Sequence, residues 1–471
     1  MSTAPLPPPI ITPLTRSQDL HDCLGDYRRD HADDVFVVEE RVSADQDVTA
    51  LVWELAGRGR HPVVWCDDVE GRGLPLVTNL FASRPRIAHW LDAEPADLHV
   101  AYQRRARRPH PMREVESGPV LDEVVLGDDV DLTSLPLVTH FESDLGPYIT
   151  NGIVVAEDAA TGAGNLSYHR AVVLSRTTLG TSLHSRGDLW RMLQDAAERD
   201  APLPVAMVLG AHPLFMLAAS ARVAFDVDER DIAGGLLGTG LDVVRTPVHG
   251  LRVPAGAEYV LEGVIDPRHH AEEGPFGEFS GYSSDRSTHN RLDVQAILHR
   301  RDAWWVDVVG GNSDEHLNLA RVPREAEMIE RLKERFACVV DVHYPRSGTH
   351  FHCYLAVRQR RAGEARQAML GLLGWDPYLK TVVAVDDDVD ITDDSEVLWA
   401  LATRFQPTED IVVVERLPGS ALDPSSTADG STSRLALDAT RGPAFNAARI
   451  RISDTARANA ARLLDRSPRD A

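Results

Sequence analysis

The length of the chain is the feature that most limits its fold. A chain of 471 residues is too long for one ordinary hydrophobic core, so we expect two or three domains of roughly 100–200 residues each. Short apolar runs alternate with segments of helical periodicity over much of the sequence, which is typical of mixed α/β units. The sequence therefore predicts a multidomain α/β protein.

Composition and charge argue against several classes of protein. No apolar run approaches the roughly 20 residues that span a bilayer, and the first 15 residues lack the pattern of a secretory signal, so we expect a cytoplasmic protein without a membrane anchor. The formal net charge of −23 would repel nucleic acid, and the basic cluster Arg104–Arg108 is too short to reverse that. The four cysteines have no CxxC spacing, which argues against a zinc ribbon.

The pattern of apolar runs divides the chain. Short β-rich runs such as Ile149–Val155 and Leu292–Leu298, separated by turn residues, favour a barrel or sandwich in the middle of the chain. The charged stretch Glu315–Arg335 has helical spacing and predicts a long linker helix. The expected divisions are a disordered tail (1–16), an α/β domain (17–120), a β-rich domain (121–314), the linker helix (315–337), a second α/β domain (338–440) and a tail helix (441–471).

Polar side chains of ligand type gather in the β-rich part. The segment Thr-Gly-Ala-Gly-Asn-Leu-Ser-Tyr-His-Arg ends at Arg170 and contains Asn165 and Ser167, and His184 follows it. Each of these residues alone has an ordinary alternative, because a single Arg is most often a surface ion-pair partner and a single His a polar surface residue. The grouping, and not any one residue, points to a binding site.

Two carboxylates flank a Gly-Pro-Phe-Gly turn in the same part of the chain. Glu273 and Glu278 are five residues apart, so a strand would place them on opposite faces. The Gly and Pro residues break that geometry and can fold both carboxylates toward one pocket. A solvated surface loop is the alternative interpretation of the same turn.

Together these segments resemble the UbiD family of decarboxylases, and the resemblance runs from about Pro136 to Asp410. It implies a split β-barrel that binds flavin as the central domain and an α/β oligomerisation domain at the C-terminus. The matching elements are Thr-Gly-x-x-Asn-x-Ser-x-x-Arg ending at Arg170, Glu229 shortly before Ala233-Gly234, the Glu-Gly-Pro-Phe-Gly-Glu turn, and Lys380 before Val385-Asp-Asp-Asp-Val-Asp390.

The resemblance implies an activity and a catalytic set. The activity is the non-oxidative, reversible decarboxylation of an α,β-unsaturated carboxylic acid, alkenyl or aromatic, through a covalent adduct with prenylated FMN. A natural-product acid is among the substrates that this allows. In this set Arg170 and Glu278 lie at the substrate carboxylate, Glu278 is the general acid, and Glu273 holds Arg170.

The resemblance also implies a metal and a cofactor site. Asn165, His184 and Glu229 would hold Mn²⁺ (or Mg²⁺) at the cofactor phosphate, with K⁺ sharing Glu229. An amide, an imidazole and a carboxylate form a mixed N/O ligand set that suits Mn²⁺. Lys380 would reach the same phosphate. The weaker assignments to the flavin pocket are Thr150, Ser167, the 312–315 segment and Phe279.

Two departures from the family pattern concern the walls of this site. Leu183 precedes His184 where several relatives have a polar residue, which predicts a more apolar pocket, and Asp158-Ala-Ala-Thr161 replaces the usual Asp-Pro-x-Thr as a loop variation. The acidic run Asp386–Asp390 lacks the Gly and final Glu of a calcium loop, so we interpret it as strand-end chemistry. His350 and His352 are expected to be structural.

The resemblance further implies partners. We expect a small unsaturated acid as substrate, a flavin prenyltransferase as the supplier of the cofactor, and a homodimer, with a hexamer as the next choice. Two other functions stay open at this point: a metal-dependent hydrolase without flavin, and a flavin-binding protein without turnover.

Overall fold

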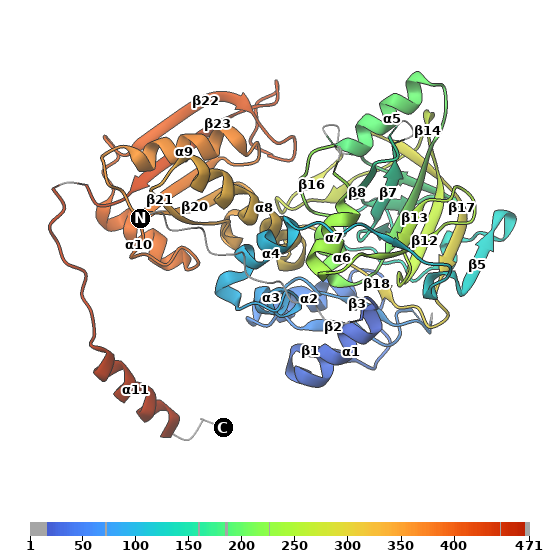
Figure 1. Ribbon diagram of the computed structural model, residues 1–471, viewed down its shortest axis with the longest axis horizontal. Helices are drawn as coiled ribbons and strands as arrows, with labels where there is room; N and C mark the ends of the chain where they lie inside the picture. Colours follow the sequence, from blue (N-terminus) through green and yellow to red (C-terminus); the bar gives the residue numbers. More distant parts are fainter. Residues whose placement is uncertain are drawn as a thin grey trace, which may run out of the picture.

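The computed structural model describes residues 17–70, 73–158, 161–183, 187–225, 227–442 and 444–466. Its strands form three main sheets packed with helices, so the expected α/β multidomain fold class is confirmed (Figure 1). The tail expected over 1–16 and the predicted ligand His184 lie outside the described residues. Within those ranges, no helix is both long and apolar enough to cross a membrane.

The N-terminal sheet is completed by a strand from much later in the chain. Its strand order is β1–β2–β3–β18, and β18 (Trp305–Val306) pairs in parallel with β3. The N-terminal and central parts therefore share one sheet and pack directly together. The remaining elements here are α1 (Leu20–Asp30), β1 (Val35–Val38), α2 (Asp47–Gly57), β2 (Val63–Cys66), β3 (Leu76–Thr78), α3 (Arg84–Trp90) and α4 (Leu98–Ala106).

The central sheet is a curled, antiparallel half-barrel. Its strand order is β6–β9–β10–β17–β14–β11–β7–β8, with β5 paired to β17. Two small sheets, β13–β12–β4 and β15–β16, lie beside it. Its strands are β5 (Glu123–Leu126), β6 (Tyr148–Ile149), β7 (Ile153–Glu157), β8 (Gly164–Tyr168), β9 (Ala171–Val173), β10 (Thr178–Thr181), β11 (Leu203–Leu209), β14 (Tyr259–His270) and β17 (Asn290–His299). The small sheets contain β4 (Arg113–Glu114), β12 (Asp242–Arg245), β13 (Arg252–Pro254), β15 (Phe276–Gly277) and β16 (Ser283–Ser284).

Both faces of the central sheet are buried. Along β11, Val205 and Met207 pack into one hydrophobic cluster, whereas Ala206 and Val208 pack into another. Side chains alternate between the faces of a strand, so a strand with two buried faces has an uninterrupted apolar sequence. The apolar run in β11 is therefore a consequence of burial on both sides.

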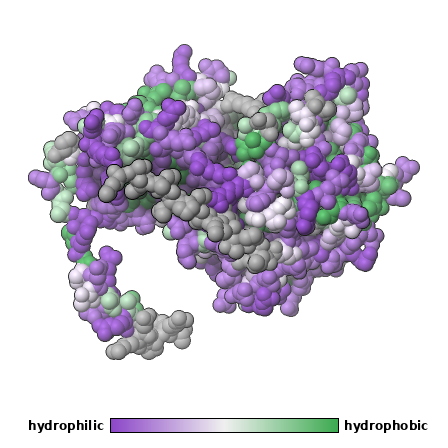
Figure 2. All heavy atoms as spheres, in the orientation of Figure 1, coloured by the Kyte–Doolittle hydropathy of each residue, from purple (hydrophilic) through white to green (hydrophobic). Residues whose placement is uncertain are grey.

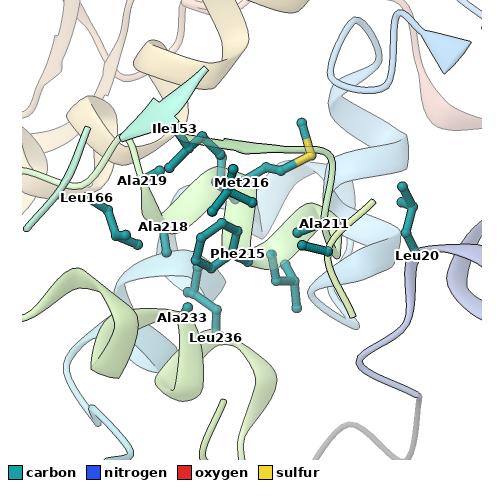
Figure 3. Close-up of a cluster of buried hydrophobic side chains, with 14 of the residues drawn as sticks. Leu20, Ile153, Leu166, Ala211, Phe215, Met216, Ala218, Ala219, Ala233 and Leu236 are labelled. Atoms are coloured by element: carbon teal, nitrogen blue, oxygen red, sulfur yellow. The ribbon is translucent and has the colours of Figure 1, made fainter. Parts of the chain in front are cut away.

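Two short helices fix the loop that follows them. α6 (Pro213–Ala218) is buried along its whole length, and Figure 3 shows Phe215 and Ala218 packed with Ala233 and Leu236 of α7 (Glu229–Leu237). A Cβ on Gly235 of α7 would stand 2.7 Å from the Arg105 carbonyl oxygen, so only glycine allows this close approach to α4. The chain leaves α6 at a defined place and turns there toward the cavities described below. α5 (Asp188–Glu198) packs beside the central sheet.

The long helix α8 (Asp314–Arg335) links the central part to the C-terminal lobe, where a helix was expected over Glu315–Arg335. Its first half contributes Leu319 and Val322 to the core of the N-terminal and central parts. Its second half contributes Ile329 and Leu332 to the C-terminal core. One rigid helix is therefore anchored in two hydrophobic cores.

Glu315 ties the start of α8 to the N-terminal part. Its buried carboxylate accepts hydrogen bonds from the backbone N–H groups of Asn79 (2.8 Å) and Phe81 (3.2 Å) and from the Thr78 hydroxyl (3.2 Å). Glu315 ends the 312–315 segment that was assigned to the flavin pocket; its side chain makes these contacts with the N-terminal part, and the role of the segment stays a prediction. A loop and a helix more than 230 residues apart are joined by this one group.

The C-terminal lobe is a five-stranded sheet in the order β19–β20–β21–β23–β22. Its elements are β19 (Val339–His343), β20 (His352–Val357), α9 (Glu364–Trp375), β21 (Thr381–Asp386), α10 (Asp394–Arg404), β22 (Ile411–Pro418) and β23 (Ser431–Ala439). Ile411 and Val413 are exposed on the edge strand β22, and Figure 2 shows an apolar patch on this side of an otherwise mostly hydrophilic face. The final helix α11 (Asp454–Arg466) stands away from the body (Figure 1).

Replacing Glu315 with Ala should destabilise the protein strongly. Two backbone N–H groups and one hydroxyl lose their acceptor in a buried place, and each unsatisfied group costs about 1–3 kcal/mol. We expect the free energy of unfolding, measured by urea titration, to fall by about 2–5 kcal/mol. Glu334→Ala, at an exposed position of the same helix, should change it by less than about 0.5 kcal/mol. Equal effects of the two substitutions would contradict the role given to Glu315.

Candidate active site

Two adjoining cavities lie between the central sheet and the C-terminal lobe. The smaller has a volume of about 390 Å³ and the larger about 840 Å³. They share a wall made of Ala219, Ser220 and Arg222 from the chain after α6, together with Tyr378 and Leu422 from the C-terminal lobe. Both parts of the fold are therefore needed to form the site.

The smaller cavity contains a buried group of one arginine and two carboxylates. Arg170 donates to Glu273 through Nε (2.7 Å) and Nη2 (3.3 Å), and its Nη1 donates to Glu278. Burial lowers the pKa of the Arg170 guanidinium, but the two carboxylates more than offset this and raise it above its usual range. The sequence prediction that these three residues form one unit agrees with this geometry.

The turn between the two carboxylates directs both of them toward Arg170. β15, within the turn, pairs with β16 in a short hairpin, and the Gly277 N–H donates to Asp144 (2.9 Å). The Arg170 guanidinium also lies 4.7 Å from the centre of the Phe276 ring. The Gly-Pro-Phe-Gly segment is therefore the floor of a pocket, and the surface-loop alternative does not describe it.

Tyr148 supports the carboxylate side of this group. Its hydroxyl donates to Glu273 (3.3 Å) and accepts from the Gly274 N–H (3.0 Å), and the ring is fully buried against Phe276. Desolvation by burial, reinforced by the Glu273 charge, raises the pKa of Tyr148, so the hydroxyl stays protonated and can donate. Tyr148 belongs to the polar Tyr-Ile-Thr-Asn-Gly segment of the sequence, but it resembles an ordinary core tyrosine there.

Asn165 and Glu229 meet at the larger cavity. The Glu229 carboxylate accepts from the Leu166 N–H (2.9 Å) and from the Asn165 side chain (3.4 Å), because Asp228 caps α7 and places Glu229 in its first turn. Burial raises the pKa of Glu229 to about 8, and the charges of Asp228 and Asp188 add to this. In the described part of the chain Glu229 has no cationic side chain within ion-pair distance.

The third predicted metal ligand, His184, cannot be placed because it lies outside the described residues. Among the described residues, no group of three or more His, Cys, Asp or Glu side chains is arranged to hold a metal. Asn165 and Glu229 are thus together at the cavity, and the complete ligand set stays a prediction.

The other predicted cofactor residues occupy different places. Thr150 lines the smaller cavity and donates to Asp307 (3.0 Å), and Ser167 lines the larger and donates to Asn165 (3.1 Å). Phe279 lines the smaller cavity, with its ring 4.7 Å from the His350 ring. All three residues therefore line a cavity, and their contact with a flavin stays a prediction.

Lys380 lies outside the wall of both cavities in this structure. Its ammonium donates to Asp423 (3.0 Å) and to Ser425 in the chain between β22 and β23. A role at a cofactor phosphate would require Lys380 to leave Asp423, and it stays a prediction.

Sequence reasoning missed several polar residues of the smaller cavity, among them Arg222, Arg286, His316, Arg324 and Tyr378. It also assigned His350 to a structural role, whereas this side chain lines the cavity. His316 and Arg324 stand in a charged helical pattern, which is usually a solvated face. The acidic run 386–390 was interpreted as strand-end chemistry, and Asp386 and Asp388 do bind Arg404 at the end of β21.

Comparison with known proteins extends these observations. Family models of the N-terminal, Rift-related central and C-terminal domains of 3-octaprenyl-4-hydroxybenzoate carboxy-lyase match residues 28–105, 113–313 and 317–439. Anhydromevalonate phosphate decarboxylase of Aeropyrum pernix is 33% identical over 412 residues, which cover 86% of this chain and 90% of the relative.

Solved structures give the same assignment. The UbiD-class enzyme HmfF from Pelotomaculum thermopropionicum in complex with FMN has a TM-score of 0.86 and 30% identity, covering 92% of this chain and 97% of that one. An evolved dimeric form of HmfF in complex with prenylated FMN has a TM-score of 0.84 with the same identity and coverage. Fold, cavity and relatives define a decarboxylase, that is, a carboxy-lyase. The chain belongs to the UbiD family.

Replacing Tyr148 with Phe should weaken the support of Glu273. The Gly274 N–H loses its acceptor, so the free energy of unfolding should fall by about 1–3 kcal/mol, and a shifted Glu273 should lower kcat roughly 10-fold with unchanged flavin content. Tyr282→Phe is the matched control, because Tyr282 lies in the same hairpin and is 64% exposed. An unchanged kcat in a folded Tyr148→Phe protein would show that Glu273 needs no such support.

Proposed function

We propose that the protein removes CO₂ from an α,β-unsaturated carboxylic acid, alkenyl or aromatic, non-oxidatively and reversibly, with prenylated FMN as its cofactor. The observation that carries this proposal is the buried Arg170–Glu273–Glu278 group at the cavity of a chain whose structural relatives bind FMN and prenylated FMN. Family membership favours this function over the hydrolase and the flavin carrier without turnover.

The residues of the smaller cavity suit binding of a carboxylate and transfer of a proton. Arg170 holds its positive charge, and the substrate carboxylate lies near it and near Glu278. Glu278 is 7% exposed and stands between Phe276 and Phe279, so water has little access to it. Glu278 donates the proton to the carbon from which CO₂ has left. Glu273 and Tyr148 hold Arg170 in place.

The donor set of the cavities fits a flavin nucleotide. Apolar side chains such as Leu183 and Val308 line the smaller cavity, as a flat aromatic ring system requires, while the hydroxyls of Ser167, Ser220 and Ser420 line the larger. When bound, prenylated FMN supplies the dipole that takes up the electrons of the breaking carbon–carbon bond. The residues that would hold it are Thr150, Asn165, Ser167, Arg170, His184, Glu229, Phe279 and Lys380.

The larger cavity also suits a divalent cation. The buried Glu229 carboxylate and the Asn165 amide oxygen are oxygen ligands, and a Mn²⁺ or Mg²⁺ ion would balance both this carboxylate and a cofactor phosphate. His184 is proposed as the third ligand, and K⁺ as a second ion that shares Glu229.

Co-expression with a flavin prenyltransferase tests the cofactor. The purified protein should show a visible flavin spectrum, the released cofactor should have the mass of prenylated FMN, and a panel of unsaturated acids should release CO₂. The same chain expressed without the prenyltransferase is the control and should carry no prenylated flavin. Absence of flavin after co-expression would overturn the proposed chemistry.

Glu278→Gln should abolish turnover while the cofactor stays bound. An amide cannot donate the proton, and removal of a general acid costs about 10²–10⁴-fold in kcat. Glu272→Gln is the control, because Glu272 precedes the same turn and is exposed. Flavin absorbance reports cofactor content in both proteins. Wild-type turnover by Glu278→Gln would remove Glu278 from the catalytic role.

The remaining expectations are proposals of the same kind. The protein acts in the cytoplasm, receives its cofactor from a flavin prenyltransferase, and assembles as a homodimer or, as the second choice, a hexamer. The division into domains at 17–120, 121–314, 315–337 and 338–440 is proposed on the pattern of the sequence.

A further inference from the structure

Two arginines, Arg222 and Arg324, line the smaller cavity in addition to Arg170 and Arg286. Arg324, on α8, is 4% exposed and lines this cavity, and its Nε and Nη1 atoms are buried without a hydrogen-bond acceptor among the described residues. Arg222, in the chain after α6, makes no hydrogen bond or ion pair with any residue that the structure describes. A buried guanidinium without acceptors is costly, so the Arg324 group indicates that a ligand supplies them, whereas Arg222 is exposed and is free to reach the same ligand.

Both arginines converge on one aromatic ring. The guanidinium carbons of Arg222 and Arg324 lie 5.5 Å and 4.9 Å from the centre of the Tyr378 ring. Burial and the nearby charge of Arg324 lower the pKa of Arg222, which agrees with two cations held close together. Two guanidinium groups near one ring repel each other, and an anion bound at the cavity wall would offset that repulsion.

The nearby carboxylates neutralise this pair only in part. Asp376 is fully buried, and its Oδ2 stands 3.6 Å from the Arg324 Nε, beyond ordinary hydrogen-bond distance. Its oxygens already accept from the Tyr344 hydroxyl (2.8 Å) and the Tyr378 N–H (3.0 Å). Glu327, the other acid nearby, is paired with Arg331 at 2.9 Å. A net positive charge is left facing the cavity.

Two neutral histidines connect this pair to the proposed catalytic residues. His350 lines the cavity, and its buried Nδ1 has no partner among the described residues. Burial and the positive charges of Arg324 and Arg222 hold the pKa of His350 well below its usual range, so the imidazole is neutral. His316 lies within electrostatic reach of His350 as well as of Glu278 and Arg170. One continuous cavity thus joins the two groups of arginines.

We propose that Arg222 and Arg324, together with Tyr378 and His350, bind a second anionic group of the substrate, so that the enzyme acts on unsaturated acids with a phosphate or carboxylate at their far end. The inference rests on the proposed function, which places the reacting carboxylate at Arg170. A cofactor phosphate is proposed at the larger cavity, which Asn165 and Glu229 line. Arg324 and His350 line only the smaller cavity, and Arg222 and Tyr378 stand in the wall that the two cavities share.

A phosphate is one of the two candidates for the second anionic group of the substrate. The Aeropyrum pernix relative is named for a phosphorylated acid, and two guanidinium groups match the charge and oxygen geometry of a phosphate monoester. A second carboxylate offers the same two-oxygen edge to an arginine. Matched substrates separate these two sources.

The experiment uses the full chain loaded with prenylated FMN. Its substrates are three acids with the same unsaturated end: 5-phosphooxypent-2-enoate, hex-2-enedioate and 5-hydroxypent-2-enoate. We expect kcat/KM for at least one of the two acids with a second anionic group to exceed that for the hydroxy acid roughly 10- to 100-fold, as charged hydrogen bonds imply. The better of the two identifies the anion. Equal values for all three acids would overturn the inference.

Variants assign this preference to the arginines. Arg324→Gln and Arg222→Gln should each raise KM for the preferred acid roughly 10- to 100-fold and remove most of its kcat/KM advantage over the hydroxy acid. Arg335→Gln is the control, because Arg335 lies on the same helix and is exposed. The Arg222 variant keeps the test decisive if the buried Arg324 variant does not fold, since Arg222 is exposed to the cavity.

Two further readouts separate the possible failures. Inorganic phosphate should inhibit the wild type competitively and the arginine variants much less. Loss of flavin absorbance in the variants would assign the arginines to the cofactor and overturn the inference. If the loaded enzyme releases CO₂ from no unsaturated acid of any kind, the proposed function itself fails, whereas turnover without preference for a second anion refutes this inference alone.

Discussion

The site depends on an arginine that is held away from water between two carboxylates. Removing such charges from solvent is costly, and the group is stable only because each partner has a defined place: Arg170 follows β8, and Glu273 and Glu278 stand at the two ends of one turn. The Tyr148 hydroxyl donates to Glu273 and in turn accepts from the Gly274 N–H. The rest of the fold can be understood as the frame that keeps these segments together.

That frame is unusual in using three parts of the chain for one cavity. The turn after β14 supplies the carboxylates, the buried helix α6 directs the chain that carries Ala219 and Arg222, and the C-terminal lobe supplies Tyr378 and Leu422. The charges within it are unevenly distributed. At one side Arg170 is matched by two acids, whereas Arg324 lacks an acceptor for two of its nitrogen atoms and Glu229 lacks a cation among the described residues. A ligand can supply the missing partners: an anion for Arg324 and a cation for Glu229.

Much of the fold could be predicted because its causes are local. The helix over 315–335 and the strands at 205–209 and 292–298 follow from periodicity and apolar runs. The run at 149–155 reads as one strand, but the structure has two, β6 and β7, and the break between them brings Thr150 to the cavity. A Cβ at Gly152 would clash with the His169 carbonyl oxygen, a contact that only the folded sheet creates.

The residues of the candidate site also divide into those that the sequence predicts and those that only the structure shows. Arg170, Glu273 and Glu278 were accessible to sequence reasoning because they belong to a compact motif with a fixed spacing. Arg222 and Arg324 were not, because an arginine in a loop or on a charged helix has the same appearance whether it faces water or a cavity. Lys380 shows the reverse case, in which a motif residue is recognised but its side chain binds Asp423.

The anchoring of α8 in two cores limits the insertions and deletions that this part of the sequence tolerates. An α-helix turns by about 100° per residue, so one inserted or deleted residue between Ala320 and Leu332 would rotate the C-terminal lobe against the central sheet by that angle. Leu319 and Leu332 could then no longer both face their cores. The length of this helix should therefore stay fixed among relatives that share the cavity, even where the identities of its exposed residues drift freely.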